Sequence, residues 1–289
     1  MKSASIDPEF QSYLRDPPRL TYSQEDDGWI RRKLASSLEA LMGRKEIEAV
    51  YKRLKDDAFH IESFFGDALN EMKISADFDE QQLLAIPKTG PLMFVANHPF
   101  GVVDGLILCD LAARVRGDLR IMLNSQLFQD KDLAPYFLPI DFSNTKSAIR
   151  TNIRSKQLAL EHLSQDLPVL IFPSGMVSTA TRFGFGEVKD GPWTTFAAKI
   201  IKEAQATVVP CFFHGRNSRK FHVASHIAEP LRMALLMHEA LKRRDKKVRV
   251  EIGTPLSWQQ LSKQGDRKKL TEYLYVQVQA LSELSVHNN

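Results

Sequence analysis

Residues 91–116 read PLMFVANHPFGVVDGLILCDLAARVR, and this stretch decides the fold. It begins with five apolar residues, 92–96, a length that suits a buried β-strand, and it ends with a helical stretch near residues 105–116. Pro99 and Gly101 lie between them and indicate a tight loop. A buried strand, a loop and a helix in this order form the repeating unit of an α/β protein with a parallel sheet.

The same alternation continues to the end of the chain. Apolar runs recur at 119–123, 169–172, 207–213 and 248–252, with helical stretches near 145–164, 192–205, 229–244 and 267–284. We therefore expect an α/β fold with a largely parallel sheet flanked by helices. Ligands of such sheets bind where the strands end, so the residues after each apolar run are the first candidates for a site.

The first 86 residues have a different pattern. Residues 1–27 have no sustained period and predict an irregular arm, whereas residues 28–86 predict a helical segment. Its apolar stripes predict three short helices, starting near residues 29, 47 and 64, that dock on the protein or rest on a bilayer. We place a linker at 74–90 and an α/β domain at 87–289.

Composition excludes several classes of protein. The chain has 289 residues, 43% of them hydrophobic and 26% charged, as globular proteins do. No apolar run approaches the ~18 residues of a membrane-spanning helix, and the N-terminus lacks the apolar region of an export signal, so we expect a cytoplasmic protein. Cys109 and Cys211 are too few for a disulfide framework, and we expect both to be buried and reduced.

The charge is unevenly divided along the chain. Residues 1–90 carry 13 basic and 17 acidic side chains, whereas residues 91–289 carry 26 and 18. The basic part suits an anionic partner: a phosphate-bearing cofactor, an acidic carrier protein, an anionic membrane surface or nucleic acid. The basic run at 242–247 is most simply a solvated helix end, with a membrane-facing patch as the second interpretation. Without interleaved aromatic residues, it does not favour nucleic acid.

The loop after the first strand carries the strongest chemical signal. His98 followed by Asp104 at the start of the next helix can place a carboxylate against one imidazole nitrogen and leave the other facing a substrate, as a general base requires. In an isolated pair of this kind, the His more often hydrogen-bonds a turn and the Asp more often caps the helix. Two other strand ends, FPSGMVS at 172–178 and VPCFFHGRNS at 209–218, favour a shared site because both carry proline, small and polar residues.

Other chemistries lack their motifs. There is no Gly-x-Ser-x-Gly elbow and no Gly-x-x-x-x-Gly-Lys phosphate loop. Gly184-Phe185-Gly186 lacks the third glycine of a dinucleotide-binding loop. His222 and His226 have the spacing of a zinc pair but no adjacent glutamate, so we predict no metal site.

Together these motifs resemble the glycerophosphate and lysophospholipid acyltransferases, which share an Asn-His motif with a downstream Asp, a Phe-Pro-Glu-Gly-Thr-Arg-Ser block and a late Val-Pro strand. Residues 97–105, NHPFGVVDG, match every fixed position of Asn-His-Pro-x-Gly-x-x-Asp-Gly. That form is typical of a bacterial branch labelled hemolysins, which includes ornithine-lipid acyltransferases. The resemblance covers about residues 47–261 and includes Asp190-Gly191-Pro192-Trp193.

The resemblance implies an acyltransferase fold and an O-acyltransferase that moves a fatty acyl group from acyl carrier protein or coenzyme A to a hydroxyl of a lyso-aminolipid of the ornithine-lipid type. His98 is then the general base and Asp104 orients it, with the N–H groups near Gly101 or Gly175 as candidates to receive the oxyanion. No bound cofactor is expected, because the thioester is a substrate. The expected substrate-binding residues are Asn97, Gly101, Pro173, Ser174, Gly175, Arg182, Arg216 and Asn217.

Two alternatives remain open at this point. Ser174 and Val177 replace the Glu and Arg of the family block, and an Arg can hold a phosphate in a bidentate grip that neutral side chains cannot replace. We therefore place a lyso-aminolipid ahead of lysophosphatidic acid, although Arg182 could restore the grip from another loop. The other alternative is a non-catalytic lipid- or membrane-binding protein. In either case we expect peripheral binding to the anionic inner face of the membrane.

Overall fold

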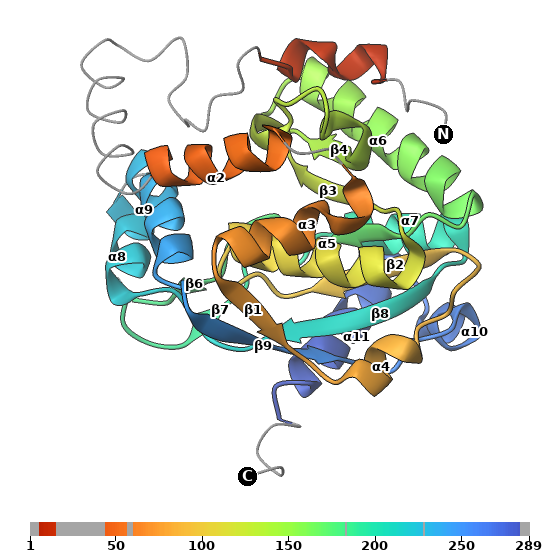
Figure 1. The fold of residues 1–289 in the computed structure, drawn as a ribbon. Helices are drawn as coiled ribbons and strands as arrows, with labels where there is room; N and C mark the ends of the chain where they lie inside the picture. Colours follow the sequence, from red (N-terminus) through yellow and green to blue (C-terminus); the bar gives the residue numbers. More distant parts are fainter. Residues whose placement is uncertain (1–5, 16–43, 57–59, 183, 228, 284–289) are drawn as a thin grey trace.

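A computed structural model describes residues 6–15, 44–56, 60–182, 184–227 and 229–283. They form a seven-stranded sheet with helices around it (Figure 1). The strand order is β1-β9-β8-β2-β5-β3-β4. Neighbouring strands are parallel except β8 and β9, so β9 and β1 run against the other five. The strands are β1 (Ile74–Asp77), β2 (Leu92–Ala96), β3 (Arg120–Asn124), β4 (Phe137–Ile140), β5 (Val169–Ile171), β8 (Thr207–Phe213) and β9 (Lys246–Ile252). The expected α/β fold with a largely parallel sheet is confirmed.

Helices cover both faces of the sheet (Figure 1). One layer contains α2 (Arg44–Asp56), α3 (Ile61–Glu71) and α5 (Val102–Arg116). The other contains α6 (Lys146–Ser164), α7 (Phe196–Ala204) and α11 (Arg267–Ala280). The residues of β2 alternate between the two apolar cores, with Phe94 in the first and Val95 in the second. Because both faces of β2 are buried, its sequence is a continuous apolar run rather than an alternating one.

Shorter elements complete the described part of the chain. A helical pair, α8 (Arg219–Ile227) and α9 (Glu229–Leu241), follows β8, and a small antiparallel sheet of β6 (Thr179–Ala180) and β7 (Val188–Lys189) lies beside α8. The remaining helices are η1 (Pro8–Tyr13), α4 (Glu80–Leu84), η2 (Ser125–Leu127), η3 (Ala134–Tyr136), α10 (Trp258–Leu261) and η4 (Ser262–Gln264). None of the described helices is both long and apolar enough to cross a bilayer. Cys109 and Cys211 are buried and unpaired, as expected.

The segment before β2 belongs to the sheet, so the linker expected at 74–90 is wrong. It contains α4 and β1, and β1 pairs with β9 in the register of Ile74 with Lys246. β1 has only four residues, of which Ile74 alone is buried, so it carries too weak an apolar pattern to be recognised.

The helices expected near residues 47 and 64 are present as α2 and α3, and their apolar residues dock in the first core. The stripe that starts near residue 29 lies outside the described residues. Within the expected irregular arm, η1 forms a short 3₁₀ helix. Its Phe10 is buried against Phe128, with ring centroids 5.5 Å apart.

Candidate active site

A side-chain clamp joins the end of β2 to β8. The Asn97 amide donates from Nδ2 to the carbonyl of Phe213 at 3.0 Å and accepts at Oδ1 from the N–H of Phe213 at 2.7 Å. The strand pairing ends just before this point, at Ala96 and Cys211. The Asn97 amide, which was predicted to bind substrate, is therefore occupied by the backbone of β8. These bonds fix the position of the backbone just before His98.

His98 and Asp104 are brought together by the loop between β2 and α5. Nδ1 of His98 lies 3.1 Å from Oδ2 of Asp104, and the His98 side chain is 17% exposed. Its ring stacks on Phe172, at the end of β5, with centroids 3.9 Å apart and planes 22° apart. Because Nδ1 faces the carboxylate, Nε2 is the nitrogen left for a substrate.

The Asp104 carboxylate is fully buried in the first turn of α5. Burial raises its pKa, while His98 and the N–H groups of Phe100 and Gly101 act in the opposite direction because they stabilise the charged form. Both N–H groups donate to Oδ2, at 2.7 and 2.9 Å. Gly101 has a φ of +84°, and a Cβ there would lie 2.9 Å from Leu236, so only glycine fits this turn.

Asp190 holds the loop that carries His98 from a distant part of the chain. Its Oδ1 accepts from the N–H of His98 at 3.1 Å and from the Ser178 hydroxyl at 2.5 Å, and its Oδ2 accepts from the Trp193 indole at 3.0 Å. The N–H of Ser178 in turn donates to the His98 carbonyl at 2.8 Å. Sequence reasoning did not assign Asp190 to the site, and its place in the Asp-Gly-Pro-Trp segment was the only signal.

The loop after β5 is a tight turn beside His98. Ser174 donates from Oγ to the carbonyl of Met176 at 2.8 Å, and the N–H of Gly175 donates to the carbonyl of Phe172 at 2.9 Å. Gly175 has a φ of +66°, and a Cβ there would lie 2.8 Å from the ring of Phe142. Pro173 accepts at its carbonyl from the N–H of Thr194, at 3.1 Å. These residues thus build the turn.

The N–H groups of Gly101 and Gly175 themselves form hydrogen bonds within their loops. The Gly101 N–H donates to Asp104, and the Gly175 N–H donates to Phe172. The prediction that N–H groups near these glycines receive the oxyanion therefore concerns their neighbours in the two loops. Short loops need such internal hydrogen bonds to hold their shape, and the sequence does not reveal which N–H groups they use.

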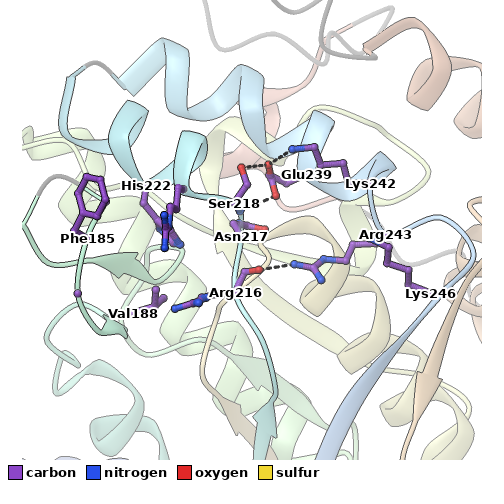
Figure 2. A pocket seen from close by; sticks show the side chains of 13 residues that line it. Phe185, Val188, Arg216, Asn217, Ser218, His222, Glu239, Lys242, Arg243 and Lys246 are labelled. Atoms are coloured by element: carbon purple, nitrogen blue, oxygen red, sulfur yellow. Dashed lines mark hydrogen bonds and ion pairs between the residues drawn. The ribbon is translucent and has the colours of Figure 1, made fainter.

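A basic pocket of about 360 Å³ lies between the β6–β7 loop, the β8–α8 loop and α9 (Figure 2). Arg216 and Asn217 line it, whereas Arg182 is exposed and is not among the lining residues. Arg243 lies over the Phe100 ring at 3.8 Å and donates to the carbonyl of Arg216 at 2.6 Å. The pocket therefore borders the NHPFGVVDG motif.

The expectation of a solvated helix end at 242–247 is only partly right. Lys242, Arg243 and Lys246 from this run line the basic pocket. Sequence reasoning missed their role because a run of like charges is usually solvated, and only the packing of α9 against α8 and α5 brings these side chains to the site.

His222 and His226 contact the backbone of the small sheet. His222 accepts at Nδ1 from the N–H of Ala180 at 3.3 Å, and Nε2 of His226 lies 2.9 Å from the Ala180 carbonyl oxygen. Burial lowers the pKa of His222. Their spacing of four residues on α8 thus brings both rings against the backbone of β6. Over the described residues, no group of three or more His, Cys, Asp or Glu side chains is placed to hold a metal ion.

The α/β fold is consistent with an acyltransferase domain. The family model described as "Acyltransferase" matches residues 73–284, and the chain belongs to this family. This membership confirms the resemblance drawn from the motifs.

Two relatives are similar over most of their length. The chain is 31% identical over 243 residues to a lyso-glycine lipid O-acyltransferase of Phocaeicola vulgatus, covering 81% of this chain and 82% of the relative. It is 28% identical over 254 residues to a lyso-glycine lipid O-acyltransferase of Bacteroides thetaiotaomicron, covering 85% and 89%. The expectation of an O-acyltransferase enzyme is confirmed by these matches.

Proposed function

We propose that this enzyme transfers a fatty acyl group from a thioester of acyl carrier protein or coenzyme A to the hydroxyl of a lyso-aminolipid, with His98 as the general base. The observation that carries the mechanism is the 3.1 Å approach of His98 Nδ1 to the buried carboxylate of Asp104. A carboxylate in this position holds the imidazole in the tautomer that keeps Nε2 free and stabilises the imidazolium that forms.

In the proposed reaction, His98 carries one proton from the acceptor hydroxyl to the leaving thiolate. Nε2 of His98 takes the proton of the acceptor hydroxyl while the oxygen attacks the thioester carbon. The carbon–sulfur bond then breaks, and the leaving thiolate takes the proton from the imidazolium. No acyl-enzyme forms. A general base of this kind contributes ~10²- to 10⁴-fold to the rate.

The acceptor is proposed from the relatives and from the loop after β5. Both relatives are named for a lyso-glycine lipid. Val177, in the place of the family arginine, is buried in a cluster with Phe221 and Leu235, and Arg182 is exposed outside the lining of the basic pocket. Because Val177 cannot hold a phosphate and Arg182 lies outside the pocket, we place a lyso-aminolipid of the glycine type ahead of the ornithine type and of lysophosphatidic acid.

We further propose that the enzyme works as a peripheral protein at the anionic inner face of the cytoplasmic membrane. Exposed apolar side chains follow the carboxyl ends of the parallel strands, where His98 also lies. They are Val102, Leu127, Phe142, Ile149, Ile153 and Met176. Apolar side chains beside basic ones such as Lys146 suit the boundary between head groups and acyl chains of an anionic bilayer.

An acceptor panel tests the proposal. The purified chain is supplied with acyl-carrier-protein or acyl-coenzyme A donors and with lyso-glycine lipid, lyso-ornithine lipid or lysophosphatidic acid. We expect the highest kcat/KM with lyso-glycine lipid, lost in His98→Ala. A tenfold preference for lysophosphatidic acid, about 1.4 kcal/mol, contradicts the acceptor. Lipid binding without turnover identifies a non-catalytic lipid-binding protein.

A further inference from the structure

We propose that the basic pocket is the head-group site of the acceptor, and that it selects a carboxylate joined to an amide, with Asn217 contacting the amide. This inference rests on the proposed function, because it concerns the acceptor of the same reaction. The pocket is built from the loop after β8, helix α9 and the β6–β7 loop (Figure 2).

The charge of the pocket suits an anion. Its basic lining residues are Arg216, Arg219, Lys242, Arg243 and Lys246, and its single acidic lining residue is Glu239. Glu239 is already engaged, because it accepts from the N–H and the hydroxyl of Ser218 at 2.9 and 2.5 Å and from Lys242 at 3.1 Å. The Arg216 guanidinium is exposed and has no hydrogen bond or ion pair within the described ranges. It is therefore available to a ligand carboxylate.

Asn217 supplies a second and independent observation. It is 3% exposed, yet neither its Nδ2 nor its Oδ1 has a hydrogen-bond partner in the part of the chain that the structure describes. A buried amide without partners is costly, and native proteins rarely keep one without a ligand or water to satisfy it. Figure 2 shows Asn217 on the pocket wall between Ser218 and Arg216. One donor and one acceptor side by side complement the C=O and N–H of a ligand amide.

The pocket is connected to the reacting histidine by short contacts. The Arg243 guanidinium lies 3.8 Å from the Phe100 ring centroid. The Phe100 N–H bonds the Asp104 carboxylate, which lies 3.1 Å from His98 Nδ1. Phe100 thus belongs both to the border of the pocket and to the loop that carries His98.

The same features discriminate among acceptors. The excess of positive charge repels the side-chain ammonium of an ornithine head group, whereas a glycine head group has no cation. A lysophosphatidic acid supplies an anion but no amide to pair with Asn217. The site therefore favours the smallest N-acyl amino acid head.

Three acceptors and two variants test this assignment on the full chain. The acceptors are N-(3-hydroxyacyl)glycine, its methyl ester, which lacks the anion, and the analogue with an ester in place of the amide. For the wild type we expect kcat/KM to fall about tenfold or more with each analogue. Arg216→Ala should lose the preference for the acid over the methyl ester, and Asn217→Leu the preference for the amide over the ester. Lys220→Ala removes a neighbouring exposed charge outside the pocket and should change neither.

The melting temperature separates a ligand-binding amide from a structural one. Asn217→Leu keeps the volume and removes two unpaired polar atoms, so we expect an unchanged or higher Tm. A lower Tm with unchanged acceptor selectivity shows that the amide is structural and overturns its assignment. A rise in the KM of the donor, in place of that of the acceptor, assigns the pocket to the carrier phosphate and overturns the proposal.

Calorimetry with His98→Ala tests the pocket without turnover. We expect the acid to bind and the methyl ester to bind about tenfold more weakly or not at all. If the wild type turns over lyso-glycine lipid but neither assay distinguishes the acid from its ester, the head-group site is wrong and the proposed function stands. If the acid binds selectively but no acceptor is turned over, the proposed function fails and the site stands.

Discussion

Asp190 accepts a hydrogen bond from the backbone N–H of His98, 92 residues earlier in the sequence. The same carboxylate accepts from Ser178 and Trp193, so three segments converge on it. Asp190 does not touch the imidazole ring through any of these contacts. It fixes the backbone that carries His98, the proposed base, and we expect it to act as a positioning residue.

Asp190→Asn should lower kcat by about 10- to 100-fold, because an amide has one acceptor oxygen for three donors and a small displacement of the base slows the reaction strongly. We expect the pH profile to keep its shape, since the base itself is unchanged. Steady-state kinetics across pH measure this. Glu187→Gln, an exposed carboxyl that pairs with Lys189, is the control. Equal kinetics in the two variants would contradict the positioning role.

His98→Ala and Asp104→Asn should each lower turnover by about 100-fold or more, through loss of the base and of its orienting charge. Burial raises the pKa of Asp104, so the folded protein binds a proton on this carboxyl group more tightly than the unfolded chain does. The wild type then loses stability as the pH rises through the range between the ordinary value and the raised one. Asp104→Asn lacks this loss.

We therefore expect the Tm of Asp104→Asn at neutral pH to equal or exceed that of the wild type, as measured by thermal melting. Activity of His98→Ala within a few-fold of wild type, with an unchanged Tm, removes the general-base assignment.

Asn97→Ala should destabilise the protein by about 2 kcal/mol or more, because it leaves the N–H and C=O of Phe213 buried without partners. Urea unfolding with an unchanged slope measures the loss. A direct contact between Asn97 and substrate predicts the opposite pattern, with normal stability and a raised acceptor KM.

Glu239 should stabilise the protein in a pH-dependent way. Although burial acts against it, the hydrogen bonds from Ser218 and Lys242 hold the pKa of Glu239 below its ordinary value. Its stabilisation is thus complete above that ordinary value and is lost as the pH falls through the lowered one. Glu239→Gln should be less stable than wild type at pH 7, and the two unfolding free energies should converge in acid. A constant difference across this range excludes the linkage.

Peripheral membrane binding should depend on the apolar side chains that follow the strand ends. Phe142→Ser and Ile149→Ser remove side chains that are each 57% exposed, so they should weaken flotation with anionic vesicles and leave Tm unchanged. Leu84→Ser removes a 70% exposed side chain from α4, which follows β1, a strand that runs opposite to the five strands ending near His98, and it serves as control. Binding should also fall as salt rises. Retention through carbonate washes indicates an embedded segment instead.

Local sequence determined the strand, the loop and the approach of His98 to Asp104. Leu92–Ala96 is an uninterrupted apolar run because both of its faces are buried, and it coincides with β2. His98 and Asp104 are six residues apart, on one loop and the helix turn that follows, so their approach depends on local geometry and was predictable. The run at 207–213 was recognised because most of its residues are buried, and the run at 248–252 because buried Val248, Val250 and Ile252 alternate with polar residues.

Only the tertiary structure decided which distant residues complete the site. The bond from Asn97 to Phe213 spans 116 residues, and the bond from His98 to Asp190 spans 92. Arg243 reaches Phe100 because α9 packs against α5. These contacts depend on the order of strands in the sheet and on the packing of helices over it. No local pattern of apolar and polar residues encodes that arrangement, since it follows from burying all the apolar faces together.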